Sequence, residues 1–200
     1  MTPIPTTPPY LLPYQRASEK HGGSFPALRW SDIFEQEIRF QAIMALMPIT
    51  TNHLLDIGCG RADFYKYLNL HNYKLSRYTG VEAIPALADT AKQIDQGIEI
   101  IEADFVKNPE VMFCAAEVLV CSGSLNTLRE KSFLATIKAA LSATDSTLIF
   151  NFLCSPEIAT APWICWHELG KVLDFCRGLT SNVRMLDDYR DGDVTIALRK

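Results

Sequence analysis

The stretch Leu54-Leu55-Asp56-Ile57-Gly58-Cys59-Gly60-Arg61-Ala62-Asp63-Phe64 decides the fold of this 200-residue chain. An apolar run from His53 to Ile57 leads into it, and its length suits one short strand. The residues after the glycines begin a helical pattern over about 62–70. Glycines let the backbone approach a ligand closely, and the free N–H groups of a helix start attract anions. The stretch therefore predicts a strand, a ligand-binding turn and a helix.

Short apolar runs and helical segments alternate along the rest of the chain. Strands that alternate with helices favour a parallel sheet covered on both faces, and Asp-Gly between two strand-like runs is a strong hairpin signal. We therefore predict an α/β fold, a Rossmann-like, doubly wound and mostly parallel sheet of seven strands with a C-terminal antiparallel hairpin strand. The further strands expected are Tyr78–Val81, Ile98–Glu102, Val118–Cys121, Thr147–Phe152, Asn182–Asp187 and Asp193–Arg199, and the helices are 84–94, 130–142 and 163–177, the last capped by Gly178.

The N-terminal segment differs in composition from the rest. Six of the eleven prolines fall within the first 26 residues, and proline resists helix formation and favours extended backbone. We predict an irregular stretch over residues 1–13 within an N-terminal arm or lid of residues 1–30. Simple disorder is the alternative, but Tyr10 and Tyr14 with two leucines between them favour a flap that folds over a cleft.

A single domain is expected to follow the arm. Its first helix begins near Ser31-Asp32, because Glu35 lies three residues after Asp32 as in a capping box, and Pro48 ends this helix. Residues 31–200 contain no internal repeat and no linker that would divide them.

Acidic residues follow the next two predicted strands at the same edge of the sheet. Glu82 ends the second strand, and Asp104 with Phe105 follows the third. In a doubly wound sheet the ligand binds in the crevice beyond the carboxyl ends of the strands. A carboxylate at Glu82 is suited to accept both hydroxyls of a ribose, and an acid beside an aromatic ring suits adenine. Each of these acids by itself is best interpreted as a surface residue. Their succession at the ends of consecutive predicted strands favours a nucleoside-binding site.

Two common nucleotide motifs fit poorly. A dinucleotide fingerprint, GxGxxG, would have its third glycine where Asp63 stands, and a carboxylate beside a pyrophosphate is unfavourable. A phosphate-binding P-loop sequence is absent from the chain.

Over about residues 50–200 the chain resembles the class I S-adenosylmethionine-dependent methyltransferases. The D/E-x-G-x-G-x-G pattern of that family matches Asp56, Gly58 and Gly60, with Ala62 at its third glycine. The resemblance implies S-adenosylmethionine as cofactor, S-adenosylhomocysteine as product, and no metal. The cofactor-binding residues that it implies are Asp56, Gly58, Cys59, Gly60, Glu82, Ala83, Asp104, Phe105, Ser122 and Gly123. We add Trp30 and Arg39 as candidates for binding the methionine end of the cofactor. We expect Arg39 to pair with the methionine carboxylate, and an ordinary helix-face arginine is the alternative.

The methyl acceptor leaves a weaker signal. A sulfonium methyl group is already activated, so the protein mainly positions the reactants, and a general base is needed only if the acceptor must lose a proton. The candidate catalytic residues are His21 and Tyr14, and the candidate substrate contacts are Tyr10, Ser124, Asn126, Trp163 and His167. Packing or surface roles are the alternative for His21, Tyr14 and His167.

Composition narrows the class of acceptor. The net charge of −4 lacks the basic excess of nucleic-acid-binding proteins. The segment after the fourth strand, Ser122–Asn126, also differs from the Asn/Asp-Pro-Pro-Tyr motif of many enzymes that methylate base amino groups.

Neither a signal peptide nor an apolar stretch of about 18 residues is present, so we expect a cytoplasmic protein without a membrane partner. The six cysteines form no CxxC pair and are expected to be free thiols.

The sequence therefore predicts an enzyme that transfers a methyl group to an O, N or C atom of a small molecule by in-line displacement. Two alternatives stay open: a protein or RNA acceptor, and a catalytically inactive cofactor-binding domain that serves a partner. The residues do not distinguish a monomer from a homodimer.

Overall fold

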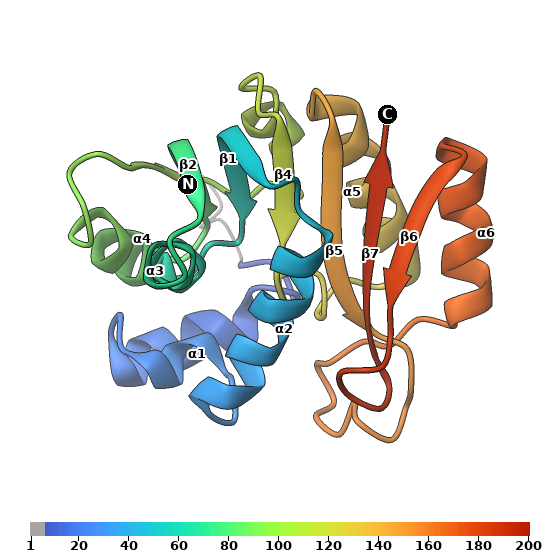
Figure 1. The fold of residues 1–200 in the computed structure, drawn as a ribbon. Coiled ribbons are helices and arrows are strands. Elements are labelled where there is room, and N and C mark those ends of the chain that lie inside the picture. The colour runs from blue at the N-terminus through green and yellow to red at the C-terminus, as the bar shows by residue number, and fades with distance from the viewer. Residues whose placement is uncertain (1–6) are drawn as a thin grey trace, which may run out of the picture.

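The computed structural model describes residues 7–200 and is built around one seven-stranded sheet (Figure 1). The strand order is β3-β2-β1-β4-β5-β7-β6. Strand β7 is antiparallel to β5 and β6, and the other neighbouring strands pair in parallel. The predicted mostly parallel sheet with its C-terminal hairpin is confirmed. The strand bounds are β1 Thr50–Ile57, β2 Lys74–Glu82, β3 Glu99–Glu102, β4 Val118–Cys121, β5 Thr147–Leu153, β6 Asn182–Leu186 and β7 Asp193–Arg199.

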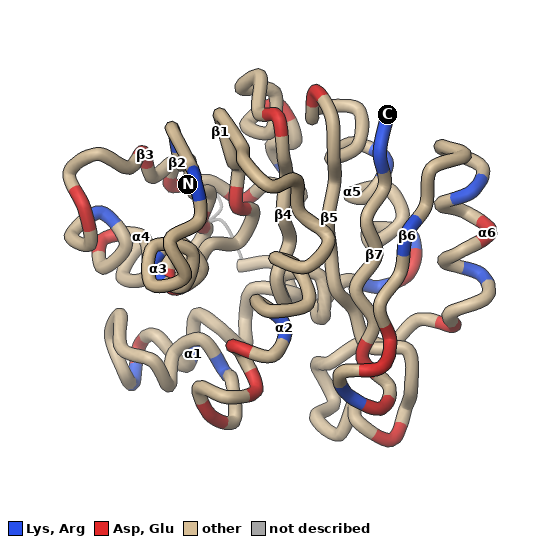
Figure 2. The backbone as a smooth tube through the Cα atoms, in the orientation of Figure 1, with Lys and Arg blue, Asp and Glu red and all other residues tan. Residues whose placement is uncertain are grey.

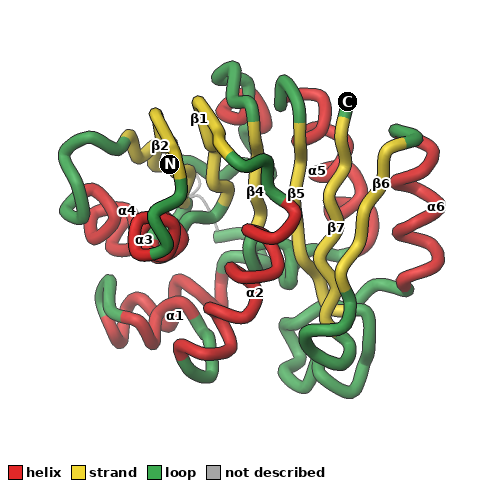
Figure 3. Tube along the Cα trace, viewed as in Figure 1, coloured by secondary structure: helices red, strands yellow, loops and turns green. Residues whose placement is uncertain are grey.

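Helices cover both faces of the sheet (Figure 3). Every residue of β4 and β5 is buried, as expected for central strands that are packed on both faces. Helices α2, α3 and α4 contribute Phe40, Phe64 and Ala91 to the core on one face, and α5 and α6 contribute Phe133 and Val172 to the core on the other. The helix bounds are α1 Leu12–His21, α2 Ile33–Leu46, α3 Asp63–Leu70, α4 Pro85–Lys92, α5 Glu130–Ala143 and α6 Leu169–Leu179, with short 3₁₀ helices η1 Phe25–Leu28 and η2 Pro109–Met112.

The strand order places a crevice at the carboxyl ends of the central strands. Strand β1 pairs with β2 on one side and with β4 on the other, so the chain connections diverge at this point. Helix α1 lies beyond this end of the sheet, at the lower left of Figure 1 beside α2.

The N-terminal arm is more ordered than its proline content suggests. Residues 1–6 of the predicted arm lie outside the described residues. From Leu12 the chain forms helix α1, so the prediction of an irregular stretch through residue 13 was wrong. Pro13 lies in the first turn of α1, where a missing backbone N–H breaks no helical hydrogen bond. Tyr14 packs with Ile84 and Leu87 and so fixes α1 against the start of α4.

The cap predicted for α2 is confirmed. Asp32 accepts a hydrogen bond from the backbone N–H of Glu35 at 3.0 Å, and the helix ends before Pro48. Within residues 7–200, no helix has both the length and the apolar character needed to span a bilayer. Lys and Arg are interspersed with Asp and Glu along the backbone (Figure 2).

The helix expected over 163–177 begins only at Leu169, and residues 154–168 form a loop. Backbone groups of this loop are satisfied outside a helix: Cys165 N–H donates to the carbonyl of Asn126 at 2.7 Å, and His167 N–H donates to that of Leu153 at 2.9 Å. Gly178 lies inside α6, which is capped by Thr180 instead.

Candidate functional site

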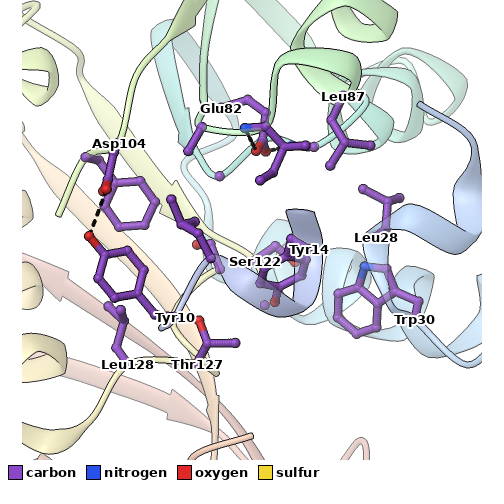
Figure 4. A pocket seen from close by; sticks show the side chains of 18 residues that line it. Tyr10, Tyr14, Leu28, Trp30, Glu82, Leu87, Asp104, Ser122, Thr127 and Leu128 are labelled. Atoms are coloured by element: carbon purple, nitrogen blue, oxygen red, sulfur yellow. Dashed lines mark hydrogen bonds between the residues drawn. The ribbon is translucent and has the colours of Figure 1, made fainter. Parts of the chain in front are cut away.

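A pocket opens at the carboxyl ends of the central strands (Figure 4). Its walls come from the glycine turn after β1, the ends of β2 to β4, and the segment of α1 and η1 that lies across them. It is elongated in Figure 4, with Asp104 and Tyr10 at one end, Trp30 and Leu28 at the other, and Glu82 between them. The lining residues are Tyr10, Leu11, Tyr14, Leu28, Trp30, Gly58, Gly60, Glu82, Ala83, Ile84, Leu87, Asp104, Phe105, Ser122, Gly123, Ser124, Thr127 and Leu128.

The glycine turn needs its two glycines for steric reasons. Gly58 and Gly60 have φ values of 70° and 56°, in the left-handed region. A Cβ atom on Gly58 would lie 2.4 Å from the Cβ of Ser124, which is impossibly close. Ala62 also has a positive φ, 56°, but it belongs to the apolar core beside α3 and does not line the pocket.

Glu82 connects the turn to the end of β2. Its Oε2 accepts a hydrogen bond from Gly60 N–H at 2.9 Å, and its Oε1 accepts one from Ile84 N–H at 2.8 Å. Burial raises the pKa of this carboxyl, and the backbone N–H donors oppose that rise. Each carboxylate oxygen keeps a further lone pair, so Glu82 can accept two more hydrogen bonds from the pocket.

Asp104 is oriented from two sides. Its Oδ2 accepts a hydrogen bond from the Tyr10 hydroxyl at 2.8 Å, the dashed contact in Figure 4, and its Oδ1 accepts one from Val106 N–H at 3.0 Å. Phe105 beside it is buried. The end of the pocket at β3 therefore offers an oriented carboxylate next to an aromatic ring.

The segment after β4 supplies polar groups without partners. Gly123 N–H donates to Asn151 Oδ1 at 2.8 Å, which holds this loop against β5. The hydroxyl oxygens of Ser122 and Ser124 are buried and have no hydrogen-bond partner within residues 7–200. Because buried polar groups are ordinarily satisfied, two orphaned hydroxyls on a pocket wall suit a polar ligand.

Three predicted cofactor residues stand behind the pocket and do not line it. Asp56 is buried and accepts a hydrogen bond from the Tyr78 hydroxyl at 2.6 Å, and burial raises its pKa to about 7. The Cys59 thiol packs beneath Gly80. Arg39 is paired with Asp193 at 2.5 Å, so its guanidinium already has a carboxylate partner within the protein.

The candidate catalytic and substrate residues separate into three places. Tyr10, Tyr14 and Ser124 line the pocket. Burial and the charge of nearby Glu82 raise the pKa of Tyr14 to about 12, so its hydroxyl stays protonated at neutral pH and is a hydrogen-bond donor rather than a base. Residues His21, Asn126 and Trp163 line a neighbouring groove.

His167 lines neither of these two cavities; it lines a third groove, together with Arg129, Cys165 and Trp166. Its ring stacks on Phe133 with 3.9 Å between centroids, and its Nε2 lies 3.1 Å from the carbonyl oxygen of Leu128. Burial lowers its pKa. His167 therefore joins the loop before α6 to the core.

Sequence reasoning missed several pocket residues. Most are apolar and come from α1, η1, the start of α4 and the loop after β4, where an apolar side chain reads as ordinary core. Helical spacing from Ile84, three residues earlier, could have identified Leu87, but nothing in the local sequence distinguishes a pocket wall from a helix contact. These residues are Leu11, Leu28, Ile84, Leu87, Thr127 and Leu128.

Comparison with known proteins identifies the fold. No protein-family model and no curated protein matches the chain. Among solved structures, magnesium protoporphyrin IX methyltransferase (ChlM) from Synechocystis PCC 6803 with bound SAM is similar over 98% of this chain and 99% of that chain, with a TM-score of 0.68 and 11% identity. The chain has the class I methyltransferase fold.

Two further structures share this fold. The DhpI-SAM-HEP complex matches 98% of this chain and 100% of its own, with a TM-score of 0.67 and 12% identity. A TehB-like SAM-dependent methyltransferase from Corynebacterium glutamicum matches 87% of this chain and 91% of its own, with a TM-score of 0.60 and 19% identity.

Proposed function

We propose that the protein is an S-adenosylmethionine-dependent methyltransferase that acts on a small molecule. The observation that carries this proposal is the pocket itself. It brings the glycine turn, Glu82 and Asp104, which follow three successive strands, to one elongated cavity at the point where the sheet topology diverges. The ligands named for the ChlM and DhpI structures, which share the fold, support the same cofactor.

The residues present fit this cofactor along the whole pocket. Asp104 and Phe105 would hold the adenine, and Glu82 would accept hydrogen bonds from the ribose hydroxyls. Gly58 and Gly60 line the part of the pocket where the methionine portion would lie, and the orphaned Ser122 hydroxyl adds a polar contact.

The chain itself would position the reactants rather than do acid–base chemistry. When bound, the cofactor supplies a methyl group activated by the sulfonium charge. Tyr14 and Trp30 line both the pocket and the neighbouring groove, so they would orient an acceptor beside the cofactor and exclude water. Orientation of the reactants alone can lower the activation free energy by about 7–11 kcal/mol.

We further propose that the N-terminal segment, described from Thr7 to Trp30, acts as a lid over the single domain of residues 31–200. Tyr10, Leu11 and Tyr14 from this segment line the pocket, and the Tyr10 hydroxyl reaches Asp104. A nucleoside as long as the pocket would be covered along one side by these side chains. The lid favours a small acceptor over a protein or RNA, because it narrows access to the site.

A thermal-shift experiment tests the cofactor assignment against other nucleotides. S-adenosylmethionine and S-adenosylhomocysteine should each raise the Tm by several degrees, because a ligand that binds only the native state stabilises it. NAD and ATP at the same concentration should leave the Tm unchanged. A shift with NAD or ATP but not with S-adenosylhomocysteine would contradict the proposal.

A further inference from the structure

A second groove lies beside the proposed cofactor pocket. Four residues line both cavities and so form the boundary between them: Tyr14, Leu28, Trp30 and Gly123. The groove continues past Asn126 toward the loop that contains Trp163. An acceptor in this groove would reach the cofactor at the shared boundary, which makes the chemistry of the groove walls informative about the acceptor.

Arg29 is the one arginine of this groove that forms no ion pair within residues 7–200. Arg39 pairs with Asp193 at 2.5 Å, and Arg190 pairs with Glu35, so two of the three guanidinium groups are neutralised. Arg29 is exposed, and within residues 7–200 it has no carboxylate within ion-pair distance. Its guanidinium therefore remains available to a ligand.

Further positive charge surrounds Arg29. His21, Arg29 and Trp163 also line an adjoining groove, to which α1 adds Arg16 and Lys20. No Asp or Glu lines that groove, and neither Arg16 nor Lys20 forms an ion pair in the described part of the chain. In a chain of net charge −4, such a local excess of basic side chains favours an anionic ligand.

The inner part of the groove suits an apolar or ring-shaped body. The Trp163 ring meets Tyr14 edge to face at 6.3 Å and carries Arg29 over its face at 5.0 Å. Leu153 and Ile158 add apolar surface. These walls resemble those of small-molecule sites, which are mostly apolar with a few polar groups that fix orientation.

One polar group stands at the floor of the groove. The Oδ1 atom of Asn126, in the loop after β4, is buried and has no hydrogen-bond partner within residues 7–200. It would accept a hydrogen bond from a hydroxyl or amine of the acceptor. The groove thus combines an inner polar anchor, an apolar wall and a cationic rim.

We propose that the methyl acceptor is a small anionic molecule whose carboxylate or phosphate is bound by Arg29, with its apolar body against Trp163. This inference rests on the proposed methyltransferase function and specifies its substrate class. Arginine suits the role because its planar guanidinium binds either anion through two parallel hydrogen bonds. The two basic side chains that α1 adds beside Arg29, those of Arg16 and Lys20, would attract the anion toward the rim of the groove.

Matched probe pairs test the charge requirement directly. Hydroxybenzoate and phenyl phosphate, with the neutral hydroxybenzamide and benzyl alcohol as counterparts, are titrated into protein saturated with S-adenosylhomocysteine. At least one anionic probe should bind 10-fold or more tightly than its neutral counterpart, and the two anions distinguish a carboxylate from a phosphate preference. Equal binding of the neutral probes, or no binding of either anion, would overturn the inference.

Variants locate the anion on Arg29. Arg29→Gln should weaken binding of the preferred anion about 10-fold, because a charge-assisted hydrogen bond is lost. Lys138→Gln makes the same charge change at an exposed site on α5 that forms no ion pair within the described residues, and it should have no effect. Both variants should bind S-adenosylhomocysteine like the wild type. Unchanged anion affinity in Arg29→Gln refutes the assignment, whereas failure of the wild type to bind S-adenosylhomocysteine refutes the proposed function and this inference with it.

Discussion

The Tyr10 hydroxyl donates a hydrogen bond to Asp104 Oδ2 at 2.8 Å, and this contact ties the N-terminal segment to the end of β3 across the candidate site. The two residues are 94 positions apart in the chain. Asp104 is the residue that we assign to adenine, so the proposed lid and the proposed cofactor site share one carboxylate. Its Oδ2 has two lone pairs and can accept from Tyr10 and from a ligand together.

Tyr10→Phe should therefore weaken binding of S-adenosylhomocysteine about 3- to 10-fold, the usual effect of losing one hydrogen bond. The matched control is Tyr65→Phe, which removes an equivalent bond from Tyr65 to Asp95, 2.7 Å long, outside the site. Isothermal titration of both variants makes the comparison. Equal affinity in the two variants would argue that Tyr10 does not orient Asp104.

Glu82→Gln should weaken the same ligand at least about 10-fold, because a carboxylate that faces two ribose hydroxyls and two backbone donors cannot be replaced by an amide with one acceptor oxygen. Glu102, the register partner of Glu82 on β3, is exposed and outside the pocket, so Glu102→Gln is the control. A similar loss in both variants would remove Glu82 from the ribose role.

The affinity should also depend on pH. Burial raises the pKa of Glu82 above its ordinary value of 4.5. If the ionised form binds the ribose, affinity declines as the pH falls through that raised pKa, and it declines at higher pH than an ordinary glutamate would allow. Titrations at decreasing pH, with Glu82→Gln as a pH-insensitive reference, measure this. A flat wild-type profile would contradict the assignment.

Asp56 should make the fold less stable as the pH rises. Burial raises its pKa from an ordinary value of 3.8 to about 7, so the native state binds more protons than the unfolded chain between these values. The stability of Asp56→Asn relative to wild type should therefore increase by about 2–4 kcal/mol between pH 4 and pH 8. Urea unfolding of both proteins at both pH values tests this. Any effect of the amide that does not depend on pH cancels when the stability differences at the two pH values are subtracted.

The control for that experiment is Asp89→Asn, at a mostly exposed carboxylate on α4. Because its ion pair with Lys92 lies on the surface, this substitution should change the free energy of unfolding by less than about 1 kcal/mol at either pH. If Asp56→Asn behaves in the same way, the buried carboxyl is ionised in the native state without penalty, and the expected linkage is absent.

Deletion of residues 1–11 should weaken S-adenosylhomocysteine binding while lowering the Tm only slightly. The cut removes Tyr10 and Leu11 from the pocket wall but leaves α1, which begins at Leu12, packed against η1 and α4. Deletion of residues 1–6 removes none of the pocket residues described and is the control. Unchanged affinity in the longer deletion would show that the N-terminal segment is not a lid.

The sheet and the cofactor end of the site were predictable because their signals are local. Parallel strands end at one edge, so Gly58, Glu82 and Asp104 converge whatever the details of the loops. Helix α1 was not predicted because the high proline content was taken to prevent a helix. Pro13, however, falls in the first turn of α1, where proline is tolerated. The loop before α6 was missed because helical spacing extends backward from Leu169 through Trp163 and Trp166.

Long-range pairings left no signal in the sequence. Arg39 and Asp193 lie 154 positions apart, and neither neighbourhood indicates that the arginine pairs within the protein rather than with a ligand. The sequence likewise does not indicate that the ring of His167 stacks on Phe133, which lies on α5 more than 30 positions earlier in the chain. The groove proposed for the acceptor also combines residues that lie far apart in the chain, including Tyr14, Trp30 and Asn126, so it appears only once the chain is folded.

Calorimetric titration of S-adenosylhomocysteine into the full-length protein tests the cofactor assignment most directly. Wild type should bind one equivalent with a saturable isotherm, and Glu82→Gln should bind at least about 10-fold more weakly under the same conditions. Absence of binding by the wild type at millimolar ligand would contradict the assignment of the pocket to this cofactor.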